Sequence, residues 1–203
     1  STHALGFLLD VRRRHPSGLV RLCHPWESGA DDSPRWDHWY GSPWVAEDVF
    51  RIKGELLAAV ERTPGGAPVD NPAFDVASAS FNALVAFNAR ELAGLTGDDR
   101  LAAAGDELAQ ALDARWDAEL RTWVDAGASA ATSGRTRTVD ALLGALVSPH
   151  ADVALADAVH PAAYGGACGP AGVHRAEPTF DPGSYWRGSA WPQLTYLLWV
   201  AAA

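Results

Sequence analysis

The densest group of chemically active side chains lies between positions 24 and 37. This stretch reads HPWESGADDSPRWD and contains four carboxylates, two indoles and one guanidinium. Pro25 and Pro34 exclude a single continuous helix, so we expect a structured loop. Carboxylates enclosed by indole rings are desolvated, which raises their pKa and lets one of them carry a proton near neutral pH. The stretch therefore predicts a general acid, although each acid taken singly is as readily a turn cap or, for Glu27, an ion-pair partner of Arg35.

A second group lies between positions 180 and 192, which read FDPGSYWRGSAWP. Arg187 offers a rigid fork of five donors between the indoles of Trp186 and Trp191, an arrangement suited to vicinal hydroxyls or a carboxylate. A sugar has such polar edges and also an apolar face that packs on an indole ring. The alternative is that both tryptophans are core residues and that Arg187 is a structural ion-pair partner.

The composition favours one globular domain with a polar, acidic surface. The 203 residues include 48% apolar side chains, and 25 acidic residues oppose 16 basic ones for a formal net charge of −9. This length supports one good core, and the negative charge argues against nucleic acid and anionic membranes as partners. Neither a membrane-spanning run nor an export signal is visible, so we expect a soluble, cytoplasmic protein.

Two features of the sequence indicate a fragment. The chain contains no methionine, and its last seven residues, LLWVAAA, resemble the middle of an apolar helix without a stop signal. We therefore expect a partial domain over 1–203, with the remainder of the same polypeptide as its partner. Cys23 and Cys168 are as readily two free thiols in a reducing compartment as one bridge.

The periodicity of apolar residues predicts an all-α chain. The spacing of three and four predicts helices over 45–62, 76–95, 98–116, 138–147, 151–159 and from about 191–192 onward. The second and third of these would form an αα-hairpin, with Asp98 as an N-cap. Residues 120–137 and 160–183 are predicted to be connections, the latter leading to residues 184–188. This pattern fits either a helical bundle or part of a toroid of helix pairs.

The sequence predicts neither a metal site nor a bound cofactor. The seven histidines lack metal-ligand spacing, and no phosphate loop or dinucleotide motif occurs. Asp31, Asp32 and Asp37 are only faintly similar to the magnesium-diphosphate site of terpene cyclases, because Pro34 interrupts the helical face that such a site needs.

The two groups are similar to motifs of the (α/α)6-barrel glycoside hydrolases that include mannosylglycerate hydrolase and the processing α-glucosidase, a group like glycoside hydrolase family 63. Residues 24–37 resemble the motif HPWESGxDNSPRWD, and residues 185–192 resemble YWRGPxWP. Between them, the FNAL sequence of residues 81–84 resembles the LFNAIL stretch. The resemblance extends from about residue 23 to residue 199.

This resemblance implies an incomplete toroid of helical hairpins, whose end helices would leave apolar faces exposed. It also implies inverting cleavage of α-glycosidic bonds in a small glucoside or mannoside, such as glucosylglycerate or mannosylglycerate, or in an α-gluco-oligosaccharide. The proton donor then corresponds to Asp31. We expect the substrate contacts to be Trp26, Glu27, Arg35, Trp36, Tyr185, Trp186, Arg187 and Trp191.

The sequence departs from the family pattern in three places. Asp32 replaces the asparagine of the motif, and Ser189-Ala190 replaces its usual continuation. The glutamate base of the resembling enzymes lies downstream of the YWRG segment, so we expect it beyond this chain, where an inverting mechanism would place it about 6.5–9.5 Å from the acid. Glu177, in the loop before Tyr185, could replace that base, but only its position in the sequence recommends it. A chain without its base would be inactive, which leaves a non-catalytic carbohydrate-binding or scaffold module as the alternative.

Overall fold

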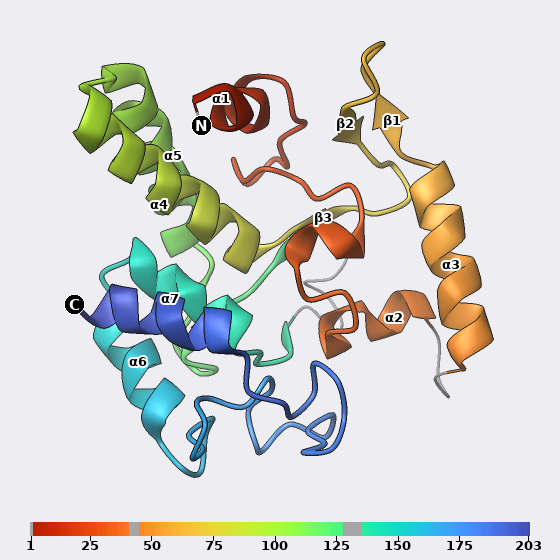
Figure 1. Ribbon diagram of the computed structural model, residues 1–203, viewed down its shortest axis with the longest axis vertical. Coiled ribbons are helices and arrows are strands. Elements are labelled where there is room, and N and C mark those ends of the chain that lie inside the picture. Colours follow the sequence, from red (N-terminus) through yellow and green to blue (C-terminus); the bar gives the residue numbers. More distant parts are fainter. Residues whose placement is uncertain (1, 41–44, 128–134) are drawn as a thin grey trace.

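The computed structural model describes residues 2–40, 45–127 and 135–203, and helices are its main regular elements, as predicted (Figure 1). The α-helices are α1 (Thr2–Asp10), α2 (Asp37–Tyr40), α3 (Ala46–Ala58), α4 (Ala79–Thr96), α5 (Asp99–Asp113), α6 (Ala151–Val159) and α7 (Pro192–Ala202). The 3-10 turns are η1 (Pro25–Ser28), η2 (Pro34–Trp36) and η5 (Asp140–Leu146).

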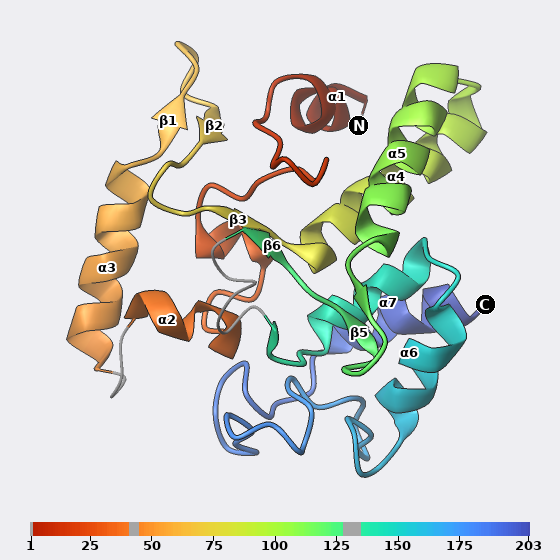
Figure 2. The same cartoon turned by 180° about the vertical axis from the view of Figure 1, so that it is seen from behind.

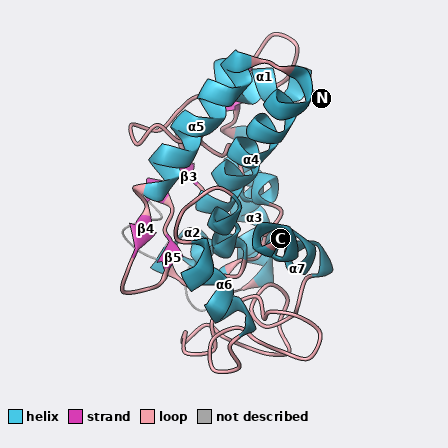
Figure 3. Ribbon diagram, turned by 90° about the vertical axis from the view of Figure 1, so that its left-hand side faces the viewer, coloured by secondary structure: helices cyan, strands magenta, loops and turns pink. Residues whose placement is uncertain are grey.

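The predicted αα-hairpin is formed by α4 and α5, which pack side by side in Figures 1 and 3. Gly97 ends α4 in the left-handed conformation with φ of 72°, which glycine adopts without a steric penalty. Asp98 then caps α5, because its side chain accepts hydrogen bonds from the backbone N–H groups of Arg100 and Leu101. The prediction of Asp98 as an N-cap is confirmed.

Short antiparallel strand pairs join the helices, contrary to the expectation of a chain without strands. The pairs are β1 (Glu61–Arg62) with β2 (Pro68–Asp70), β3 (Val76–Ala77) with β6 (Ala126–Gly127), and β4 (Trp116–Asp117) with β5 (Thr122–Trp123). Strands of two or three residues are too short to give a period-two pattern in the sequence. The β3–β6 pair holds the start of α4 beside the end of the 114–127 connection (Figure 2).

Two apolar clusters form the core. The larger one joins α1, α4, α5, η5, α6 and α7. The smaller one surrounds Trp36 and Phe74 and includes residues from α2 and α3. The candidate loop lies between these clusters, since Ala30 belongs to the larger cluster and Trp36 to the smaller.

The sequence did not predict every helical element. Helix α1 was not predicted, the segment 138–147 contains a 3-10 helix instead of an α-helix, and the middle of the expected 120–137 connection lies outside the described residues. Helix α7 exposes Tyr196 and Trp199 to 61% and 64%. Among the described helices, none has the length and apolar character to cross a membrane.

Cys23 is buried, Cys168 is exposed, and both are free thiols.

Candidate active site

The loop over residues 24–37 is ordered by its own side chains, as predicted. The His24 ring accepts a hydrogen bond from the backbone N–H of Trp26 at Nδ1, 3.2 Å away, and thereby caps η1. Gly29 ends that turn with φ of 71°, a conformation that glycine allows. Ser33 caps η2 by accepting from the backbone N–H of Arg35. The two turns leave residues 30–32 as a short arch between them.

Asp31 lies at the top of this arch and is half-buried. The indole Nε1 of Trp36 donates to the carbonyl oxygen of Ala30 at 2.7 Å, and the hydroxyl of Tyr40 donates to the carbonyl oxygen of Asp31 at 3.3 Å. Burial, together with the charges of Asp32, Asp31 and Asp37, raises the pKa of Tyr40, so its hydroxyl stays a donor at neutral pH. The backbone around the candidate acid is thus fixed, while the residue as a whole remains partly exposed.

Asp32 forms an ion pair with Lys53 of α3, with 2.5 Å between Oδ1 and Nζ. Lys53 is the single lysine of the chain, and its side chain is only 4% exposed. The carbonyl oxygen of the same lysine contacts Nε2 of His24 at 3.0 Å, which ties α3 to the start of the loop. Asp32, which replaces the asparagine of the family motif, therefore has a partner of opposite charge.

Arg35 and Trp36 lie behind the arch, not on its surface. Arg35 is 1% exposed and donates to both carboxylate oxygens of Asp125, at 2.9 and 3.0 Å, and to Asp140. Burial alone would lower the pKa of Arg35, but the two carboxylates outweigh it, so the guanidinium remains charged. Trp36 is fully buried. We therefore reassign Arg35 and Trp36 from substrate contacts to residues that support the loop.

Glu27 forms its ion pair with Arg12. The alternative interpretation of the sequence, an ion pair with Arg35, is therefore wrong. The Glu27 carboxylate accepts two hydrogen bonds from the Arg12 guanidinium, at 2.8 and 2.9 Å, and a third from the backbone N–H of Cys23. The side chain of Glu27 is 24% exposed. This residue anchors the loop to the segment after α1 and keeps one edge open to solvent.

The second motif meets the first through Arg187. Its guanidinium donates to both carboxylate oxygens of Asp37, at 2.6 and 2.9 Å, across 150 positions of sequence. Trp186 precedes it with φ of 58°, a conformation that a bulky residue rarely adopts and that is concentrated at functional sites. Gly188 follows, and a Cβ atom there would lie 2.2 Å from the carbonyl oxygen of Asp181. The motif glycine is thus required by close backbone packing.

The aromatic side chains of the two motifs divide into exposed and buried sets. Trp26 and Tyr185 are 49% and 53% exposed, whereas Trp186 is buried and stacks on the partly exposed Trp191 with ring centroids 4.2 Å apart. Tyr185 meets the Trp191 ring edge-on. Among the described residues, neither indole Nε1 of the Trp186–Trp191 stack finds an acceptor.

A cavity of about 160 Å³ joins the two motifs. Ser28, Gly29 and Ala30 line it from the first motif and Trp186 from the second, and Asp140 and Ser80 complete its polar wall. The residue before Asp31 and the residue before Arg187 therefore share one hollow. Asp31 and Arg187 themselves are not among the residues that line it.

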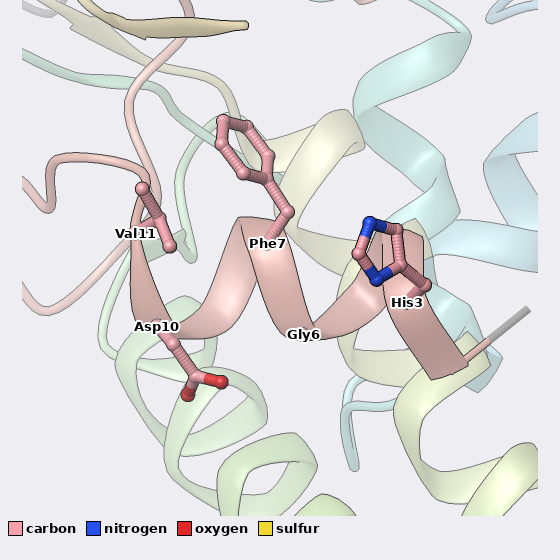
Figure 4. A pocket seen from close by; sticks show the side chains of 5 residues that line it. All are labelled: His3, Gly6, Phe7, Asp10 and Val11. Carbon is pink, nitrogen blue, oxygen red and sulfur yellow. The ribbon is translucent and has the colours of Figure 1, made fainter. Parts of the chain in front are cut away.

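Two larger hollows contain no comparable chemistry. One of about 450 Å³ is lined by five residues on one side of α1, and Figure 4 shows His3, Phe7, Asp10 and Val11 as its side chains. The other, of about 490 Å³, lies between α1 and α4 and reaches Glu27 and Ser28. The first lies outside both motifs, and the second touches only the start of one.

The other sequence candidates are engaged elsewhere. Glu177 forms an ion pair with Arg137 at 2.5 Å, so its carboxylate serves the loop in which it lies. Asp32 and Asp37 are each neutralised by a cation, which argues against the magnesium-diphosphate alternative. In the described part of the chain, no group of three side chains could hold a metal ion.

Comparison with known proteins decides the family. The model of the "Mannosylglycerate hydrolase MGH1-like glycoside hydrolase domain" matches residues 4–203. This chain belongs to that family. The resemblance seen in the two motifs is thereby confirmed, and named glycoside hydrolases are its relatives.

Two curated relatives of this chain are longer than the chain itself. Mannosylglycerate hydrolase from Thermus thermophilus is 26% identical over 95% of this chain and 54% of its own length. Glucosylglycerate hydrolase from Mycolicibacterium hassiacum is 32% identical over 32% of this chain and 15% of its own. The chain thus spans about half of the Thermus relative.

Solved structures show the same fold. The crystal structure of the Thermus thermophilus enzyme in complex with glucose superposes with a TM-score of 0.77 at 23% identity, over 97% of this chain and 54% of that one. The same enzyme in complex with Tris and D-glycerate gives a TM-score of 0.74 at 20% identity, over 96% and 55%. These structures support a fold of the GH63 type.

Sequence reasoning did not identify several residues that hold the site. Tyr40, Lys53, Asp125 and Asp140 position the acid loop from α2, α3 and the 122–140 region. Asn82 of the FNAL stretch is fully buried and bonds both the N–H and the carbonyl group of Val20. The FNAL resemblance marked Asn82 as a motif residue, and no comparable signal marked the other four.

Proposed function

We propose that the protein carrying this chain is an inverting α-glycoside hydrolase for a small glucoside or mannoside, such as glucosylglycerate or mannosylglycerate, with Asp31 as the general acid. The observation that carries the proposal is the junction of the two motifs, held by the Asp37–Arg187 ion pair beside the arch that presents Asp31. The names of the family and of its relatives support the substrate class. The finer architecture that we propose is the partial toroid implied by the resemblance.

In the proposed reaction, protonated Asp31 gives its proton to the glycosidic oxygen as the bond from that oxygen to the anomeric carbon breaks. Water adds to the opposite face of the sugar and passes a proton to a carboxylate base. That base is proposed to lie in the remainder of the polypeptide. The products are the free sugar and the released hydroxy compound, and a solvent proton restores Asp31.

The other residues have roles that follow from their exposure. Trp26 and Tyr185 are about half exposed, so the apolar face of a sugar would pack on the exposed part of their rings. Glu27 and Arg187 offer the exposed edges of their ion pairs to hydroxyl groups, and the partly exposed Trp191 extends the aromatic surface of Tyr185 while the buried Trp186 supports it from behind. The acid, the stacking rings and the polar edges then come from the two motifs.

The test compares the intact protein with its Asp31→Asn variant on mannosylglycerate, glucosylglycerate and an aryl α-glycoside with a strongly acidic leaving group. Loss of general acid catalysis should lower kcat by about 10²–10⁴-fold on the glycerate glycosides. The loss should be much smaller on the activated substrate, whose leaving group needs little protonation. NMR of the first product formed should show the β-anomer.

Asp48→Asn is the matched control, because Asp48 is an exposed carboxylate on α3 that pairs with Arg51. It should leave kcat unchanged. Equal loss on all substrates would remove Asp31 from the role of acid. Sugar binding without turnover by the intact parent would favour the non-catalytic carbohydrate-binding module instead.

A further inference from the structure

Lys53 is a buried ammonium group beside the candidate acid. Its side chain is 4% exposed, and its single ion-pair partner among the described residues is Asp32. An ammonium group removed from water is costly unless a carboxylate compensates it. The chain therefore maintains a lysine and an aspartate together at a position where the family motif has a neutral asparagine.

The pair lies within the electrostatic reach of Asp31. Asp32 follows Asp31 directly, so their Cα atoms are about 3.8 Å apart. The charges of Asp31, Asp32 and Asp37 all act on the hydroxyl of Tyr40, which donates to the backbone of Asp31. Nζ of Lys53 lies 5.4 Å from the centre of the Tyr40 ring. Lys53 and the three carboxylates thus all lie near the side chain of Tyr40.

The other charged groups in this region are already balanced. Asp37 of α2 is neutralised by Arg187, which lies in the segment between α6 and α7. Arg35 of η2 is neutralised by Asp125 and Asp140. Burial lowers the pKa of His24, whose ring packs on the backbone of α3, so this ring is neutral at pH 7. A change at Asp32 or Lys53 therefore leaves a net charge beside Asp31.

We propose that Lys53 is a positioning residue for the general acid: it holds Asp32 in a neutral ion pair next to Asp31 and so sets the pH at which Asp31 gives up its proton. The inference rests on the proposed function. It assigns α3 a part in the reaction although no atom of Lys53 need touch the substrate.

The test is the alkaline limb of the pH profile of kcat/KM for the intact protein, which reports loss of the acid's proton. In Lys53→Met, the carboxylate of Asp32 lies beside Asp31 in the chain without its cation, and the extra negative charge should move the limb up by about 0.5–1 pH unit. In Asp32→Asn, the uncompensated ammonium group should move it down by about the same amount. The double variant Asp32→Asn/Lys53→Met should return it to the wild-type pH.

Opposite shifts that cancel are a signature of charge, because a purely structural role would change thermal stability without moving the limb in two directions. Arg51→Met is the matched control, since Arg51 is an exposed cation on the same helix, and it should leave the limb in place. The inference would be overturned, and the proposed function would stand, if the wild type is active, Asp31→Asn is not, and the limb stays in place in both Lys53→Met and Asp32→Asn. An inactive wild type would overturn both.

Discussion

The guanidinium of Arg35 is enclosed between two carboxylates that are themselves buried. Arg35 and Asp125 are each 1% exposed, and Asp140 is 3% exposed. A cation enclosed in this way satisfies two acids that water cannot reach, and removal of one member leaves an uncompensated buried charge. The support of the acid loop therefore depends on this triad more than on the exposed ion pairs.

We predict that Arg35→Met lowers the free energy of unfolding by about 3–5 kcal/mol, because Asp125 and Asp140 lose their partner while the alkyl stem is roughly retained. Urea denaturation followed by tryptophan fluorescence measures the loss. Arg51→Met, at an exposed ion pair of α3, should cost less than about 1 kcal/mol. Equal, small losses in the two variants would show that the triad does not support the fold.

The types of the site residues were predictable, but their partners were not. The sequence placed Asp31, Trp26 and Tyr185 in two chemically rich loops, and the structure leaves these three accessible. It gave no means of pairing Arg35 with acids 90 and 105 positions away. Such pairs follow from the packing of distant elements, whereas a local pattern reports only on neighbours in the chain.

At the scale of elements, the predicted helices are those with a long apolar period. The amphipathic pattern identified α3, α4, α5, α6 and α7 within a few residues of their ends. The turns η1 and η2 and the helix α2 have three or four residues each, too few for a helical period to be visible. These short turns are stabilised by side-chain caps, such as the hydrogen bond that the His24 ring accepts at the start of η1.

The cap at His24 predicts a pH-dependent loop. Burial lowers the pKa of His24 below 6.5, so the folded protein binds a proton there less readily than the unfolded chain does. The stability from the neutral ring is fully present above pH 6.5 and is lost as the pH falls below that value. Protonation also removes the Nδ1 acceptor that caps η1.

We therefore expect His24→Asn, which keeps a capping oxygen but does not titrate, to flatten the fall in unfolding free energy between pH 7 and pH 5. At pH 7.5 the variant should differ from wild type by about 1 kcal/mol or less. His160 also accepts a backbone hydrogen bond at Nδ1, but in an exposed turn, so His160→Asn is the control and should keep the wild-type slope. An unchanged slope in His24→Asn would contradict the role of the buried ring.

At the scale of the whole molecule, the Asp37–Arg187 ion pair joins the acid loop, residues 24–37, to the long segment between α6 and α7. Figures 1 and 3 show the segment between α6 and α7 as a coil without helices, and its backbone hydrogen bonds are those of turns and isolated bridges. The guanidinium and carboxylate are 19% and 32% exposed, and they form two charge-assisted hydrogen bonds. This contact links the two motifs directly.

We expect Arg187→Met and Asp37→Asn each to speed hydrogen exchange of the backbone over 181–191 and 30–37 by about tenfold, equivalent to about 1.4 kcal/mol of local opening. Exchange in the α4–α5 hairpin, which lies in the larger core, should not change, because neither side chain belongs to that core. The charge swap Asp37→Arg/Arg187→Asp should restore part of the protection, since the pair is re-formed with reversed sign. Faster exchange in only one of the two loops would mean that the ion pair does not couple the motifs, and the site would then depend on the shared cavity and the Trp186 packing alone.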